Sequence, residues 1–162
     1  MSSTSTATTA KPNWRNPIHW LAFGFGSGAA PKAPGTFGTL AALLPYYFLQ
    51  DLPLLPYLAI ILISFVAGIY ICGQCSKDLG VHDHGGIVWD EFVGLWITLI
   101  AVPTGWPWVV LGFVLFRIFD IAKPWPIRWA DKQVSGGLGI MLDDVLAGLY
   151  ALALLQLIAW FV

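Results

Sequence analysis

Long apolar runs, separated by short polar or turn-forming stretches, dominate the chain after residue 36. They cover residues 37–50, 54–73, 87–102, 108–121 and 140–162. Nearly uncharged runs of this kind are typical of helices that enter a membrane. The pattern therefore predicts an all-α protein, a polytopic integral membrane helical bundle with about five membrane-embedded helices and four as the alternative.

The first 36 residues follow a different pattern. Residues 1–13 are rich in Ser, Thr and Ala and hold no apolar core, so we expect a disordered N-terminal tail. Residues 14–23 are aromatic and mildly basic, as in a segment at a membrane interface. Residues 24–36 contain four Gly and two Pro, which predicts a loop. We therefore expect residues 14–162 to form one membrane-embedded domain.

Composition narrows the class of protein further. The chain is 57% hydrophobic, and only 10% of its residues are charged, where a soluble domain has roughly 25%. That balance excludes a soluble monomer. A net charge of −1 excludes a generally basic nucleic-acid binder. The expected partner is the lipid bilayer, and the composition leaves the oligomeric state open.

The distribution of charge separates four crossings from five. If the chain turns back at residues 103–107, five crossings place all eight Lys and Arg on one side, and Asp51 is the only charge opposite. Four crossings divide the basic residues between the two sides. The positive-inside rule therefore favours five crossings with the charged side in the cytoplasm. Against this, the run 37–50 rises only about 21 Å as a helix, short of a hydrocarbon core of about 30 Å.

Six acidic residues lie at the ends of the apolar runs on the charged side: Asp83, Asp90, Glu91, Asp120, Asp143 and Asp144. Mg²⁺ prefers carboxylate, phosphate and water oxygens. A single acidic pair could serve only to complement a helix dipole. Two pairs, each followed at once by apolar sequence, are costly for that purpose alone. We therefore predict a metal site formed by Asp90, Glu91, Asp143 and Asp144.

Basic and histidine side chains are the other candidates for chemistry. Arg117, Asp120 and Lys123 share one helix face and could clamp a phosphate, or form a structural ion pair beside a snorkelling lysine. Lys32, in the Gly/Pro loop, is a further phosphate candidate. His82 and His84 could act as acid or base, or could belong to a solvated turn.

Cysteines offer one competing metal site. Cys72 and Cys75 form a C-x-x-C that, with the two histidines, could be read as a zinc site. The motif ends a membrane span, where small residues also ease helix packing. We therefore favour packing over zinc.

Three long segments carry a family resemblance. They read GFGSGAAPKAPGTFGTLAA (24–42), KDLGVHDHGGIVWDEFVGLWITL (77–99) and FRIFDIAKPWPIRWADKQVSGGLGIMLDDVLAG (116–148). With the spacing between them, the chain closely resembles the bacterial phosphatidylglycerophosphatase A family over residues 14–160. The resemblance implies an all-α, Mg²⁺-dependent enzyme of the bacterial inner membrane. Such an enzyme removes the terminal phosphate from phosphatidylglycerophosphate, leaving phosphatidylglycerol.

The resemblance also implies which positions of this sequence match the family's motif residues. The family's positions are, in this sequence, Thr36, Asp83, Asp90, Glu91, Asp120, Lys123, Asp143 and Asp144. We expect catalysis from the residues Asp83, Asp90, Glu91, Asp143, Asp144, His82 and His84. We expect substrate or phosphate binding by Lys32, Thr36, Arg117, Asp120 and Lys123.

Other functions and mechanisms stay open at this point. An aspartyl-phosphate intermediate could replace direct attack by water. Spans interrupted by Pro and Gly also suit a small ion or anion transporter. A phosphatase for another lipid phosphomonoester, such as phosphatidic acid, is the third alternative.

Overall fold

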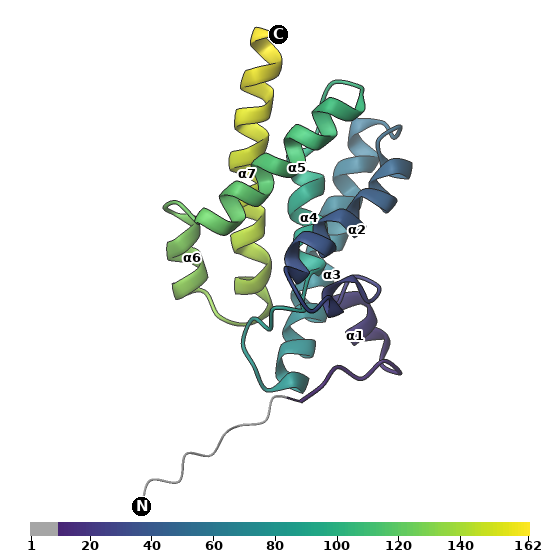
Figure 1. Ribbon diagram of the computed structural model, residues 1–162, viewed down its shortest axis with the longest axis vertical. Helices are drawn as coiled ribbons and strands as arrows, with labels where there is room; N and C mark the ends of the chain where they lie inside the picture. Colours follow the sequence, from purple (N-terminus) through teal and green to yellow (C-terminus); the bar gives the residue numbers. More distant parts are fainter. Residues whose placement is uncertain (1–9) are drawn as a thin grey trace, which may run out of the picture.

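A computed structural model describes residues 10–162, and within that range the protein contains helices and no strands, as predicted (Figure 1). In chain order its elements are α1 (Pro17–Ala22), a short 3-10 helix η1 (Ser27–Ala29), α2 (Pro34–Leu49), α3 (Leu54–Leu79), α4 (Trp89–Thr98), α5 (Trp106–Ala122), α6 (Ile127–Gln133) and α7 (Gly136–Phe161). Residues 1–9 of the predicted tail lie outside the described residues, so the disorder of that tail stays a prediction.

The five apolar runs correspond to α2, α3, α4, α5 and α7. Helix α4 ends at Thr98 and α5 begins at Trp106. The single helix over residues 91–119 that the four-crossing alternative requires is therefore absent. Figure 1 places the α2–α3 turn, the α4–α5 turn and the C-terminus at the same end. Within the described range only α3 and α7 are long and apolar enough to cross a membrane. The count of five crossings therefore stays a prediction.

Helix α4 lies at the centre of the molecule. Its residues from Asp90 to Thr98 are all buried, and it packs against α2, α3, α5 and α7. It runs beside α7, and a methyl group on Gly148 would lie 2.5 Å from the carbonyl oxygen of Gly94. Small residues at such a crossing let two helix backbones approach closely. Asp90 lies one turn before Gly94, and Asp144 one turn before Gly148, so this crossing brings their carboxylates together.

The glycine-rich segment before α2 packs against the loop that leads into α4. A methyl group on Gly24 would lie 2.8 Å from the Val88 side chain, and Gly24 has a φ of +56°, which favours glycine. The backbone N–H of Val88 donates to the carbonyl oxygen of Ala22 at 2.8 Å. This packing fixes the loop that carries Asp83 and His84.

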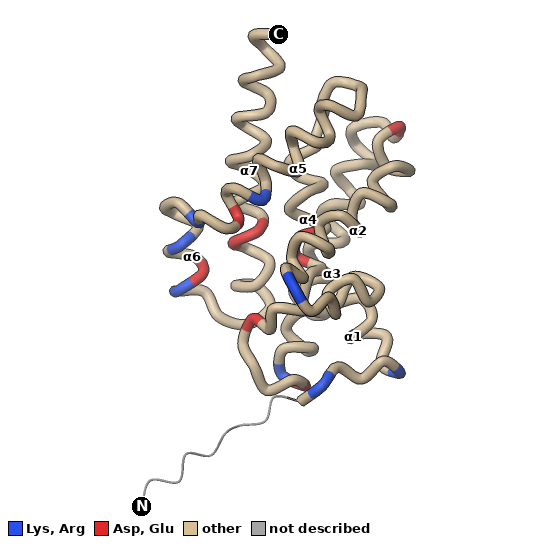
Figure 2. The backbone as a smooth tube through the Cα atoms, in the orientation of Figure 1, with Lys and Arg blue, Asp and Glu red and all other residues tan. Residues whose placement is uncertain are grey.

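The surface divides into an apolar end and a charged end. Large apolar side chains are exposed along several helices, including Leu44, Phe48, Leu55, Leu62, Ile63 and Ile121. Figure 2 shows the charged positions gathered away from the end that holds the C-terminus, except Asp51 at the α2–α3 turn. An exposed apolar surface of this extent suits contact with lipid rather than water.

Candidate active site

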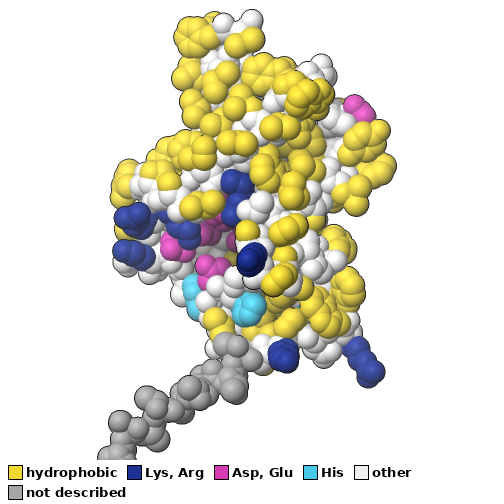
Figure 3. All heavy atoms as spheres, viewed as in Figure 1, with side chains coloured by type: hydrophobic (Ala, Val, Ile, Leu, Met, Phe, Trp, Pro, Cys, Tyr) yellow, Lys and Arg dark blue, Asp and Glu magenta, His cyan; other side chains and the backbone are white. Residues whose placement is uncertain are grey.

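A cavity of about 240 Å³ opens where the charged and apolar parts of the surface meet. Figure 3 shows the acidic, basic and histidine side chains together in this hollowed region. Its charged lining consists of six carboxylates, from Asp83, Asp90, Glu91, Asp120, Asp143 and Asp144, and of two cations, from Arg117 and Lys123. The structure thus brings together all six acidic residues predicted from the sequence. They come from the α3–α4 loop and from α4, α5 and α7.

Two groups of carboxylates could each hold a metal ion. Asp90, Glu91 and Asp144 form one group, and Asp120, Asp143 and Asp144 form the other. Within each group the candidate ligand oxygens all lie within 4.8 Å of one another. Asp144 belongs to both groups, so two ions held there would share it. Asp120, predicted to bind substrate, is thus also a candidate metal ligand.

The carboxylates of these groups are short of hydrogen-bond donors. Asp144 is only 1% exposed and Asp90 only 6% exposed. Among the described residues, Asp144 Oδ2 and Asp90 Oδ1 are buried oxygens without a hydrogen-bond partner. A buried, unpaired carboxylate is costly unless a cation or donor compensates it. Hard oxygen donors of this kind fit Mg²⁺, and two divalent ions would balance the excess of four carboxylates over cations.

Arg117 and Thr39 hold the Glu91 side chain from two sides. The Arg117 guanidinium lies 3.5 Å from Glu91 Oε1 and also pairs with Asp120 on the next turn of α5. The Thr39 hydroxyl, from α2, donates to Glu91 Oε2 at 2.9 Å. Arg117 Nε is buried and has no acceptor among the described residues. Arg117 also lines the cavity, so its guanidinium can contact an anion there.

Lys123 ends α5 and reaches across to two other helices. Its Nζ lies 3.1 Å from Asp143 on α7 and 3.1 Å from Asp131 on α6. Burial lowers the pKa of Lys123, but these two carboxylates raise it more, so the net shift is upward and the ammonium persists at neutral pH. Removal from water raises the pKa of Asp83, and the nearby Lys123 opposes that shift only in part.

The two candidate histidines occupy different environments. His84 lines the cavity, and its Nδ1 accepts the backbone N–H of Gly86 at 2.9 Å. The neutral ring therefore carries its proton on Nε2, which can donate. His82 is not part of the cavity lining, and its Nε2 accepts the backbone N–H of Gly136 at 3.2 Å.

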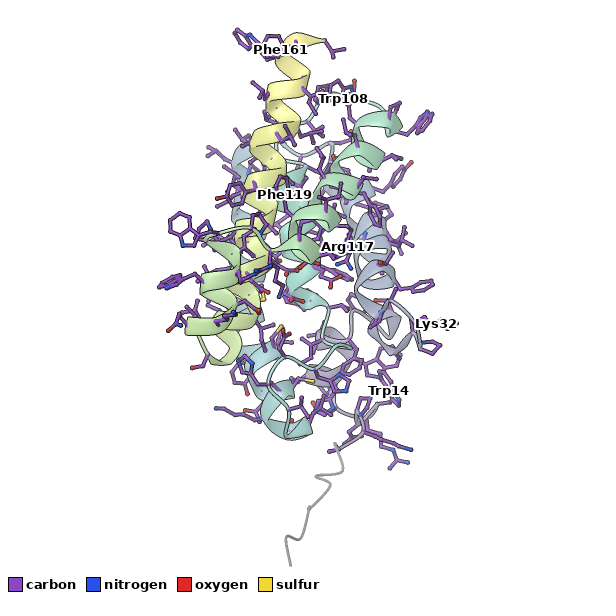
Figure 4. All side chains as sticks on the ribbon, turned by 60° about the vertical axis from the view of Figure 1, so that its left-hand side comes forward. Trp14, Lys32, Trp108, Arg117, Phe119 and Phe161 are labelled. Atoms are coloured by element: carbon purple, nitrogen blue, oxygen red, sulfur yellow. The ribbon has the colours of Figure 1, made fainter. Side chains whose placement is uncertain are left out.

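Two of the predicted phosphate-binding residues also lie outside the cavity lining. Lys32 is exposed, and Figure 4 places it at the edge of the molecule, apart from Arg117. Thr36 lines a neighbouring apolar groove. The cysteines lie in α3, where Cys72 is buried against Met141, its Sγ 3.8 Å from the methionine sulfur. The groups of possible metal donors found among the described residues contain carboxylates alone.

Several residues of the site were missed in the sequence. Thr39 holds Glu91, and Gly35 lines the cavity where a methyl group would lie 2.6 Å from Glu91 Oε1. Gly94 and Gly148 set the distance between the two acidic helices. A signal was present for that pair, because an acidic residue precedes each glycine by four positions, in Asp90-x-x-x-Gly94 and Asp144-x-x-x-Gly148.

Fold and site together define a helical membrane protein with a carboxylate-rich cavity that could bind metal. The sequence model of the family described as Phosphatidylglycerophosphatase A matches residues 20–159. The chain therefore belongs to the phosphatidylglycerophosphatase A family and is a phosphatase.

Two of three curated relatives carry the name of this family. Phosphatidylglycerophosphatase A of Escherichia coli K12 is 54% identical over 144 residues, covering 88% of this chain and 84% of the relative. The protein of the same name from Haemophilus influenzae is 51% identical over 138 residues, covering 84% and 85%. A Bacteroides thetaiotaomicron protein is 43% identical over 145 residues, covering 85% and 90%, and carries the provisional name phosphatidylinositol-3-phosphatase. The comparison with solved structures found no match.

Proposed function

We propose that the protein is a Mg²⁺-dependent lipid phosphatase that hydrolyses the terminal phosphomonoester of phosphatidylglycerophosphate. The products are phosphatidylglycerol and inorganic phosphate. The observation that carries the proposal is that two three-residue sets of carboxylates share Asp144, and that two of their buried oxygens have no hydrogen-bond partner among residues 10–162. The names of the Escherichia coli and Haemophilus influenzae relatives support the choice of substrate.

The proposed metal ligands are Asp90 and Glu91 with Asp144 on one side, and Asp120 and Asp143 with Asp144 on the other. Mg²⁺ bound there would neutralise phosphate charge and make a water molecule more nucleophilic. The surrounding helices hold the carboxylates in place before substrate arrives. The carboxylates are removed from most of the solvent, which strengthens the charge interactions among them.

The other lining residues would bind the phosphate and the leaving group. Arg117, whose side chain lines the cavity, would donate to a phosphate oxygen. Lys123 would balance charge from the opposite side of the cavity. His84 would donate from Nε2 to the departing glycerol oxygen. In this proposal water attacks phosphorus directly, so in water enriched with ¹⁸O the label enters phosphate and no carboxylate.

The proposed location is the bacterial inner membrane, with the cavity facing the cytoplasm. All eight Lys and Arg lie in the part of the molecule that holds the cavity, and Asp51 is at the opposite end (Figure 2). Basic residues favour the cytoplasmic side of a membrane. The cavity would then meet the bilayer at the level of the cytoplasmic lipid headgroups.

A panel of lipid phosphomonoesters tests the proposed function. In detergent with Mg²⁺ we expect phosphate release from phosphatidylglycerophosphate to exceed release from phosphatidic acid and phosphatidylinositol 3-phosphate by about tenfold or more. Excess chelator should abolish it, and added Mg²⁺ should restore it. Equal release from all three lipids would contradict the substrate assignment. Full activity in chelator would contradict the metal, and no release from any lipid would contradict a phosphatase.

The two histidines give a second prediction with a built-in control. His84→Leu should lower kcat by about tenfold to a hundredfold because the cavity loses the Nε2–H donor proposed to face the leaving group. His82→Leu should keep kcat within about twofold because His82 contacts the backbone of Gly136 instead. Both variants are measured at saturating lipid and Mg²⁺. Equal losses in the two variants would show that the loop's structure matters, not the His84 nitrogen.

A further inference from the structure

An apolar groove of about 460 Å³ runs along α5 beside the acidic cavity. Its apolar lining comes entirely from α5, from the side chains Phe113, Val114, Ile118, Ile121 and Ala122. Ile121 is 70% exposed and Ile118 52% exposed. A groove of this size is within the range of sites that hold small molecules or lipid chains, roughly 300–1,000 Å³. The other lining residues are Thr36 and Arg117.

The groove exists because α2 and α5 are both supported by α4 but do not pack closely on each other. The two helices come together near the start of α2. A methyl group on Gly35 would lie 3.0 Å from a guanidinium nitrogen of Arg117. The groove is therefore open along the apolar part of α5 and ends at Arg117.

Arg117 joins the groove to the acidic cavity. Its side chain lines both, and the consecutive residues Gly35 and Thr36 line one each. Along this path the surface changes from the apolar face of α5, to Thr36 and Arg117, to the carboxylates. Phosphatidylglycerophosphate, the substrate proposed above, has the same order of chemistry, from acyl chain to diester phosphate to terminal phosphate.

We propose that this groove between α2 and α5 admits an acyl chain of the lipid substrate sideways from the bilayer. The inference rests on the proposed function. Ile118 and Val114 contact the chain, Thr36 lies at the level of the diester phosphate, and Arg117 lies between that level and the terminal phosphate. This arrangement explains why Thr36 lies in the groove wall instead of the carboxylate cavity. The terminal phosphate then reaches the carboxylates while the chains stay in lipid.

Filling the groove tests the proposal. Val114→Trp and Ile118→Trp should lower kcat/KM for long-chain phosphatidylglycerophosphate by at least about tenfold, because an indole occupies the space of the chain. The same variants should keep kcat/KM for the dihexanoyl lipid within about twofold, since a short chain leaves most of the groove empty. The matched control is Ile63→Trp, an exposed position on α3 that does not line the groove. It should hydrolyse both lipids like the wild type.

The outcomes distinguish a failure of the groove proposal from a failure of the proposed phosphatase activity. Equal loss for long and short chains, or undiminished long-chain activity in both groove variants, overturns the inference.

A second measurement does not depend on turnover. A phospholipid with a diazirine on its acyl chain should label residues 113–122 of the wild type, and Ile118→Trp should reduce that label at least about fivefold. Labelling that is unchanged by Ile118→Trp also overturns it. A wild type that is labelled there but releases no phosphate contradicts the proposed function and not the groove.

Discussion

Asp144→Asn should lower the rate of phosphate release at saturating lipid and Mg²⁺ by at least about 10³-fold, equivalent to ~4 kcal/mol of transition-state stabilisation. Asp144 is the carboxylate common to both candidate metal groups. An amide in its place keeps the shape of the side chain but removes its charge and one oxygen ligand. Both proposed ions would be affected at once. Phosphate release measured across a Mg²⁺ titration checks the prediction.

The control for this variant is Asp51→Asn. Asp51 is exposed at the α2–α3 turn, at the opposite end of the molecule. The turnover of the Asp51→Asn variant should stay within about twofold of the wild type. Asp144→Asn should also remain folded, with unchanged helical content by circular dichroism, because it removes charge repulsion from a crowded acidic site. Turnover like the wild type in Asp144→Asn would remove Asp144 from the metal site.

Hydrophobic runs predicted the long helices well, because each long helix has an apolar surface to bury or expose to lipid. A break was predicted at residues 103–107 and is present, but it lies at residues 99–105, because α4 ends at Thr98 and α5 already begins at Trp106. Helix α6 was missed because its seven residues contain too few apolar positions to form a run. Pro45 interrupts the run at 37–50, yet α2 continues through it. A proline inside a helix is tolerated when neighbouring helices satisfy the backbone groups that it frees. The sequence of one segment does not show which helices will be its neighbours.

The acidic residues of the site could be identified from sequence because charges beside apolar runs are costly and rarely incidental. Their grouping could not. Asp144 meets Asp90 only because Gly94 and Gly148 let α4 and α7 approach, and Asp120 joins Asp143 through the packing of α5 on α7. The direction in which each side chain points could not be predicted from the sequence either. His84 lines the cavity and His82 does not, although they are two residues apart.

Arg117→Met should impair both stability and activity. The Arg117 side chain is 15% exposed and pairs with Glu91 and Asp120, so its removal leaves two carboxylates without their cation. Breaking a buried ion pair by removing one partner costs about 3–5 kcal/mol. Loss of a donor to the phosphate should lower kcat/KM by about 10²–10³-fold in the protein that remains folded. Thermal unfolding in detergent and phosphate release measure the two effects.

Arg117→Lys separates the charge of this residue from its shape. An ammonium can still neutralise Glu91 or Asp120, so most of the stability should return. It cannot supply a planar fork to two carboxylates and a phosphate together. We therefore expect kcat/KM to stay at least about tenfold below the wild type. Arg128→Met, at an exposed position on α6, should change neither property. If Arg117→Lys instead restored full activity, Arg117 would act through its charge alone, and the proposal that its guanidinium serves two carboxylates and a phosphate together would be wrong.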